Sequence, residues 1–90
     1  LQGIPSHEPD GPLILPPVLI GHNCNIAENS QIGPHTVIGP NCTVKNGAKV
    51  DNCILWEGTT IGAGSTVKHS IIAENKTIGD GKVINDESII

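Results

Sequence analysis

Histidine is the side chain in this sequence that could most readily do chemistry at neutral pH. Neutral imidazole is a common zinc ligand, and imidazole is also a frequent general base. Three of the four histidines, His22, His35 and His69, stand far apart in the chain and form no close pair. We therefore predict no metal ligand in this chain.

The positions of the cysteines in the sequence indicate a structural role. Cys24 and Cys42 are 18 residues apart at equivalent places of a repeat described below, so their side chains should stack near the core. A disulfide between them is conceivable, but free thiols are expected, because the sequence shows no signal peptide. Cys53 also favours structure over reactivity. With no apolar run near 20 residues, we expect a cytoplasmic protein without a membrane partner.

Two glycine-containing segments superficially resemble phosphate-binding loops. These are Gly62–Thr66 and Gly79–Lys82, but both fall at regular corners of the repeat and neither precedes a predicted helix. Phosphate loops depend on the N–H groups at a helix N-terminus. We therefore expect no cofactor-binding residue here.

The composition indicates an all-β fold. The 90 residues contain no Phe or Tyr, one Trp, 11 Gly and 7 Pro, and β-branched aliphatic residues stand between the turn formers. Such residues favour strands. The formal net charge of −4, without a cluster of basic residues, argues against a nucleic-acid partner.

An aliphatic residue recurs every six positions. The period shortens by one residue before Leu55 and again before Ile72, so equivalent residues are first 18 and later 17 apart. Three such hexads should make one coil, with each strand bonded to the coils on either side. We call the recurring residues rungs: Ile14, Ile20, Ile26, Ile32, Ile38, Val44, Val50, Leu55, Ile61, Val67, Ile72, Ile78 and Ile84.

The fourth place of each hexad predicts the corners of the coil. A corner needs a residue that tolerates positive φ, which favours Gly and then Asn, Asp or His. The residues at this place are Asn23, Asn29, His35, Asn41, Gly47, Gly58, Gly64, Asn75 and Gly81.

These patterns predict a parallel β-helix of hexapeptide repeats over residues 14–90, with a little over four coils. Residues 1–13 carry no hexad phase and are rich in proline, so we expect a linker or extended arm. The missing initial Met suggests a piece of a longer protein. Because both ends of such a prism leave open strand edges, we predict a homo-oligomer.

Trp56 is the one predicted interface residue. It follows the rung Leu55 and should therefore point outward. Exposed tryptophans are enriched at the energetic centres of protein interfaces. We expect Trp56 to contact another subunit or a preceding catalytic domain.

The segments Pro16–Gly21, Asp51–Gly62 and Lys68–Ile72 resemble the C-terminal β-helix of NDP-sugar pyrophosphorylases, above all mannose-1-phosphate guanylyltransferases. The resemblance covers about residues 14–90 and implies a left-handed coil. In that family an N-terminal domain, which this chain does not match, joins an NTP to a sugar 1-phosphate using Mg²⁺.

The resemblance implies a non-catalytic domain for oligomerisation or regulation, and whether this chain is itself an enzyme stays open. A small acyltransferase using acetyl-coenzyme A is the alternative, with His35 or His69 as general base. Hexapeptide repeats also occur in that class of enzyme, so the repeat alone does not decide function.

Overall fold

The computed structural model describes residues 11–90. The expected linker, residues 1–13, lies almost wholly outside this part of the chain. The first strand, β1, begins at Leu13, one residue before the predicted start of the β-helix.

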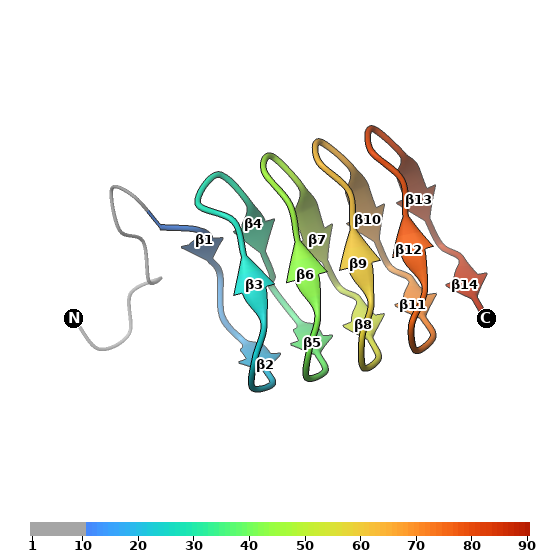
Figure 1. Ribbon diagram of the computed structural model, residues 1–90, viewed down its shortest axis with the longest axis horizontal. Coiled ribbons are helices and arrows are strands. Elements are labelled where there is room, and N and C mark those ends of the chain that lie inside the picture. Colours follow the sequence, from blue (N-terminus) through green and yellow to red (C-terminus); the bar gives the residue numbers. More distant parts are fainter. Residues whose placement is uncertain (1–10) are drawn as a thin grey trace.

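Within residues 11–90 the chain forms fourteen short strands and no helix, as the all-β prediction requires. The strands make three parallel sheets, in the orders β1-β4-β7-β10-β13, β14-β11-β8-β5-β2 and β12-β9-β6-β3 (Figure 1). Their bounds are β1 Leu13–Ile14, β2 Val18–Ile20, β3 Asn25–Ile26, β4 Gln31–Ile32, β5 Thr36–Ile38, β6 Thr43–Val44, β7 Lys49–Asp51, β8 Ile54–Leu55, β9 Thr60–Ile61, β10 Thr66–Lys68, β11 Ile71–Ile72, β12 Thr77–Ile78, β13 Val83–Asn85 and β14 Ser88–Ile89.

The strands follow one another around a triangular prism. Sheets of five, five and four strands correspond to four complete coils and two strands of a fifth. In Figure 1 the chain passes from β4 at the back, down to β5 and up through β6 in front while it advances to the right. This path is left-handed, so the predicted left-handed parallel β-helix is confirmed.

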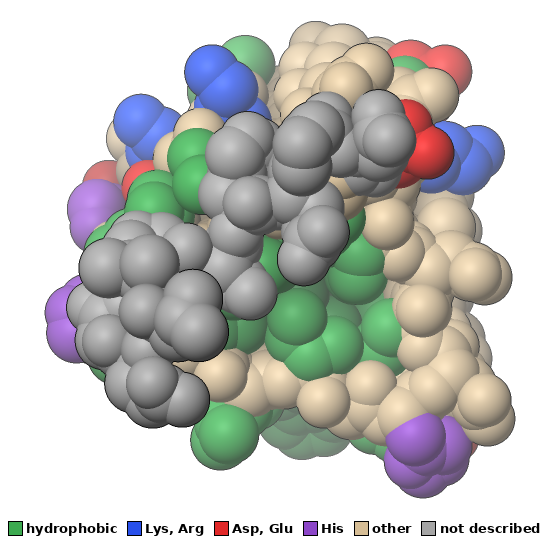
Figure 2. Space-filling view, turned by 90° about the vertical axis from the view of Figure 1, so that its left-hand side faces the viewer, with side chains coloured by type: hydrophobic (Ala, Val, Ile, Leu, Met, Phe, Trp, Pro, Cys, Tyr) green, Lys and Arg blue, Asp and Glu red, His purple; other side chains and the backbone are tan. Residues whose placement is uncertain are grey.

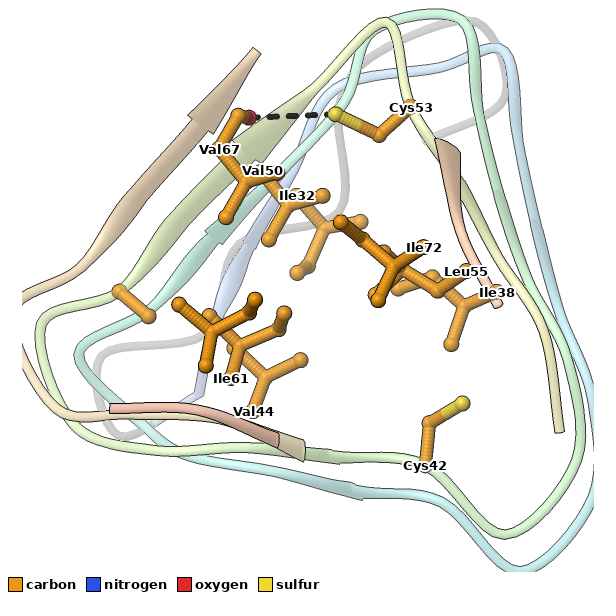
Figure 3. Packing of buried hydrophobic residues seen from close by; sticks show 12 residues of the cluster. Ile32, Ile38, Cys42, Val44, Val50, Cys53, Leu55, Ile61, Val67 and Ile72 are labelled. Carbon is orange, nitrogen blue, oxygen red and sulfur yellow. Dashed lines mark hydrogen bonds between the residues drawn. The ribbon is translucent and has the colours of Figure 1, made fainter. Parts of the chain in front are cut away.

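The rungs stack in register along each face. Ile32 pairs with Val50, Val50 with Val67, and Val67 with Ile84. Figure 3, which looks into the prism, shows rung side chains of all three sheets pointing inward, with Ile32, Val50 and Val67 in one column. Removing one residue at a corner therefore shortens the coil without shifting the register of the sheets.

The core is aliphatic in its middle and uncovered at its ends. Ile32, Ile61 and Ile72 have no exposed surface. Ile20, a rung of the first coil, remains 40% exposed because no coil covers it on one side. Figure 2 looks at this end, where hydrophobic side chains gather at the centre of the visible surface.

The corners confirm most of the positive-φ prediction and correct part of it. Asn29 is not among the residues with positive φ, so its assignment was wrong. Three further corner residues, Asn52, His69 and Asp86, adopt positive φ and were missed. They lie in the shortened hexads. There the corner residue stands at the third place, counting the rung as the first, and not at the fourth place used for the prediction.

Small polar side chains fasten one coil to the next at the corners. The Ser65 hydroxyl donates to the Gly79 carbonyl at 2.6 Å. The single Thr59 hydroxyl proton is shared between the Trp56 carbonyl of its own coil, at 2.8 Å, and the Ala73 carbonyl of the next coil, at 3.1 Å. Both side chains are fully buried. A buried hydroxyl without a partner would be costly, and these bonds explain why small hydroxyl residues fit the interior of the corner.

Replacing the rung Ile61 by alanine should lower the free energy of unfolding by about 2–5 kcal/mol, the usual cost of truncating a buried aliphatic side chain. Ile61 is fully buried between Val44 and Ile78 of the neighbouring coils. Urea unfolding followed by circular dichroism measures the change. The control is Thr60→Ala on the outward side of the same strand, expected to cost less than about 1 kcal/mol. Equal costs would contradict the inward and outward assignment.

Candidate functional site: an outward apolar row beside Trp56

Trp56 directly follows β8, and its side chain is exposed to solvent, with 50% of the residue surface accessible. Its backbone is firmly held. The Trp56 N–H donates to the Ile72 carbonyl at 2.9 Å, and its own carbonyl accepts the Thr59 hydroxyl at 2.8 Å. The structure therefore presents an apolar ring from a fixed backbone, while its contact with a partner stays a prediction.

Four aliphatic side chains beside Trp56 form a continuous outward row across one sheet. Leu19 pairs with Val37, Val37 with Ile54, and Ile54 with Ile71, so each lies next to the following one. Leu19 is 70% exposed and the other three are 41–43% exposed. Ile54 and Trp56 are two residues apart and point to the same side of the chain, because side chains alternate along an extended strand. We call these four residues the apolar row.

Sequence analysis did not single out the apolar row, although a signal for it exists. Each of its members immediately precedes a rung, which gives the doubled aliphatic pairs Leu19-Ile20, Val37-Ile38, Ile54-Leu55 and Ile71-Ile72. These pairs recur once per coil on one sheet, and the first residue of each pair faces outward. The aliphatic pairs Leu13-Ile14 and Val83-Ile84 lie on another sheet, but only at the two ends of the stack.

The outward positions of the other two sheets are mostly polar. On the sheet containing β3, β6, β9 and β12, the residues before the rungs are Asn25, Thr43, Thr60 and Thr77. On the sheet containing β1, β4, β7, β10 and β13 they are Leu13, Gln31, Lys49, Thr66 and Val83, of which three are polar and the two aliphatic residues lie at opposite ends of the sheet. The apolar row is therefore a property of one face of the prism.

A shallow hollow of about 330 Å³ adjoins the first-coil end of the apolar row. Leu19 and Val37 belong to both features, and Pro16, Pro17 and His35 complete most of the wall. The apolar surface thus extends from the centre of the sheet toward the open first coil.

The three histidines among residues 11–90 lie at corners and do not converge. His35 and His69 occupy the same corner column, separated by the coil that contains Asn52, whereas His22 lies at a different corner. His69 Nδ1 is 3.7 Å from Asp86 Oδ1, and both side chains are largely exposed. Within residues 11–90, no three His, Cys, Asp or Glu side chains group closely enough to hold a metal ion.

All three cysteines are free, as predicted. Two carbonyl oxygens lie within reach of the single Cys53 S–H donor, that of Asp51 at 2.9 Å and that of Val67 at 3.2 Å. Burial raises the pKa of the Cys53 thiol, and the nearby Asp51 charge adds to this increase. Burial likewise raises the pKa of the Cys42 thiol. These two thiols are therefore poor nucleophiles at neutral pH.

The hexad fold is shared by several functional classes, so the fold alone does not give the family of this chain. Residues 14–90 match the family described as GMPPB C-terminal domain. The chain belongs to this family. The match spans the whole β-helix and bears out the resemblance to the C-terminal domain of mannose-1-phosphate guanylyltransferase-like enzymes. No curated protein sequence matches the chain significantly.

This GMPPB C-terminal domain has neither a membrane-spanning helix among its described residues nor a phosphate-binding loop at its two glycine-containing segments. Over the described residues, no helix has the length and apolarity needed to cross a membrane. Gly64 and Gly81, from the two loop-like segments, are corner residues with φ of 70° and 69°. These segments therefore turn the chain between strands of adjacent sheets.

The stability of the domain should fall at alkaline pH because of the two buried thiols. In the unfolded chain they ionise near their ordinary pKa of about 8.5, whereas in the folded chain they stay protonated to higher pH. Their contribution is thus fully present below about pH 8.5 and is lost as pH rises through the folded pKa, by up to about 1.4 kcal/mol per pH unit for each thiol.

Urea unfolding at a series of pH values measures this loss, and the double variant Cys42→Ala, Cys53→Ala is the control for lysine titration. The original chain should lose more stability between neutral and alkaline pH than the variant does. Parallel pH profiles would refute the assignment of the effect to the thiols.

Proposed function

We propose that this domain is the non-catalytic assembly domain of a sugar-1-phosphate nucleotidyltransferase of the mannose-1-phosphate guanylyltransferase type. The observation that carries the proposal is the apolar row with Trp56 on one face of a prism whose other faces are mostly polar. The family match supports the parent enzyme class. Chemistry is assigned to a separate N-terminal domain, which would bind the NTP, the sugar 1-phosphate and Mg²⁺ in the cytoplasm.

The proposed occupant of the apolar row is a second copy of this domain. Neighbouring strands in a sheet are about 4.8 Å apart, so four side chains in adjacent strands make a row about 14 Å long. Contiguous exposed apolar patches mark interaction sites in soluble proteins. The row carries no charged residue, so two copies can approach face to face without desolvating a charge.

The size of the row limits the strength of this contact. A stable interface buries about 800 Å² on each partner, which exceeds what four side chains and one tryptophan provide. Residues around the row must contribute a polar rim. We therefore expect weak association of the isolated domain, in the micromolar range, which a linked catalytic domain would reinforce as a second partner.

Removing the apolar row should weaken self-association at least tenfold. In the double variant Ile54→Thr, Ile71→Thr, the β-branched shape is kept while two outward apolar groups become polar. Trp56→Ala should weaken association as well, because it removes the largest exposed apolar side chain. Sedimentation equilibrium over a range of concentrations measures the dissociation constant.

The matched control for this experiment is Val83→Thr. Val83 is 74% exposed and also precedes a rung, but it lies on a different sheet. It should leave the dissociation constant unchanged. A monomeric original chain at high micromolar concentration would contradict the second copy as occupant, and an equal effect of Val83→Thr would show that general surface hydrophobicity drives association.

Isothermal titration of the domain with GTP, mannose 1-phosphate and acetyl-coenzyme A should give no binding heat. This result is expected because the substrate sites are proposed to belong to another domain. Binding of acetyl-coenzyme A would instead favour the acyltransferase alternative. Binding of GTP or mannose 1-phosphate would contradict a purely structural role for the β-helix.

A further inference from the structure

Asn46 and Gly47 form a tight turn at the corner between β6 and β7. The Ala48 N–H donates to the Lys45 carbonyl at 3.2 Å, and Gly47 has a φ of 76°. With positive φ at its third residue only, the turn is of type II, a conformation that glycine adopts without strain. Both Asn46 and Gly47 are exposed.

The peptide unit that joins these residues is restrained on one side. The Asn46 carbonyl accepts the Gly64 N–H at 2.9 Å. Among the described residues, no hydrogen bond engages the Gly47 N–H or the Asn46 side-chain amide. The attacking and the attacked groups of an intramolecular reaction are thus both free.

We propose that Asn46 is a site of spontaneous deamidation. The Gly47 backbone nitrogen loses its proton and attacks Cγ of Asn46, forming a new C–N bond. The bond between Cγ and Nδ2 breaks, and ammonia leaves with the proton that it needs. Water then opens the resulting succinimide at one of its two carbonyls, which yields aspartate or isoaspartate. The overall reaction consumes one water and releases one ammonia.

The residue after the asparagine decides where this reaction is fast, because a side chain there hinders the attacking nitrogen. Asn46 is the only asparagine in the sequence that glycine follows. Asn23, Asn41 and Asn52 each precede a cysteine, and Asn75 precedes a lysine. These asparagines should therefore deamidate slowly, and their rates serve as internal references for the rate at Asn46.

The equivalent corners of the later coils provide a structural contrast. Ala63-Gly64 and Asp80-Gly81 occupy the same place in their coils, with φ values of 70° and 69° at glycine. The Ser65 N–H closes the first of these turns on the Gly62 carbonyl, whereas the Lys82 N–H donates to the Ser65 hydroxyl. Asp80 Oδ1 accepts the Ala63 N–H at 2.9 Å, so a hydrogen bond to the neighbouring coil engages this carboxylate. Ala63 has no group that can react. The fold thus tolerates alanine at this place and restrains aspartate, while Asn46 is left unrestrained.

The reaction would change the corner in two ways. Either product replaces a neutral amide by a carboxylate, so the formal charge of −4 becomes one unit more negative. Isoaspartate also adds one methylene to the main chain and displaces the carbonyl that accepts the Gly64 N–H. The contact between the coils that carry β6 and β9 would be loosened at this corner.

Incubation of the full chain at mildly alkaline pH and physiological temperature, followed by proteolysis and mass spectrometry, tests the proposal. The peptide containing Asn46 should gain about 1 Da, the replacement of NH₂ by OH, at a rate that increases with pH. Peptides containing the other asparagines should keep their mass over the same time. Resistance to a protease that cleaves before aspartate distinguishes isoaspartate from aspartate.

Two variants and one reference peptide make the result decisive. Asn46→Ala, which copies the Ala63-Gly64 corner, should abolish the mass gain without unfolding the chain. Ala63→Asn should create a second reactive pair. A free peptide with the sequence of residues 43–50 gives the unrestrained rate. If the folded chain keeps its mass for many half-times of that peptide, the corner protects Asn46 and the proposal is wrong.

Discussion

The whole structure depends on stacking coils of nearly equal length in register. Each coil's strand N–H groups donate to carbonyls one coil further on, as in Gln31 to Ala48 and Lys49 to Ser65, at 2.9 and 2.8 Å. Parallel pairing of this kind forms only if every coil brings each strand back beside its counterpart in the preceding coil. The 17- and 18-residue periods meet this condition because the lost residue is taken from a corner.

The backbone strain of this coiled path is concentrated at the corners. A chain that turns sharply after every two or three paired residues must place many residues at positive φ, and seven of those in the described part are not glycine. Asparagine, histidine and aspartate tolerate the conformation better than other residues with side chains. Small buried residues beneath the corners, such as Ser65 and Thr59, then secure adjacent coils through carbonyl hydrogen bonds.

The outward residues that precede the rungs do not take part in the stacked core, so their side chains are free to serve a function. One face carries Leu19, Val37, Ile54 and Ile71, whereas corresponding positions on another face are asparagine and threonine. An aliphatic residue at such a position does little to the stability of the fold, but it exposes apolar surface to water. Its repetition on a single sheet is best explained by a partner that covers it, and this connects the fold to the proposed assembly role.

The sequence by itself determined the all-β class, the hexad period, the inward rungs and most corners, because each depends on residues only a few positions apart. Trp56 could likewise be placed outward by its position after a rung. Only the tertiary structure showed that Asn52, His69 and Asp86 are corner residues, since the shortened hexads break the count from the rung. It also decided the apolar row and the exposure of Ile20. The apolar row depends on which strands become neighbours one coil away. The exposure of Ile20 depends on where the stack of coils ends, which the spacing of nearby residues does not reveal.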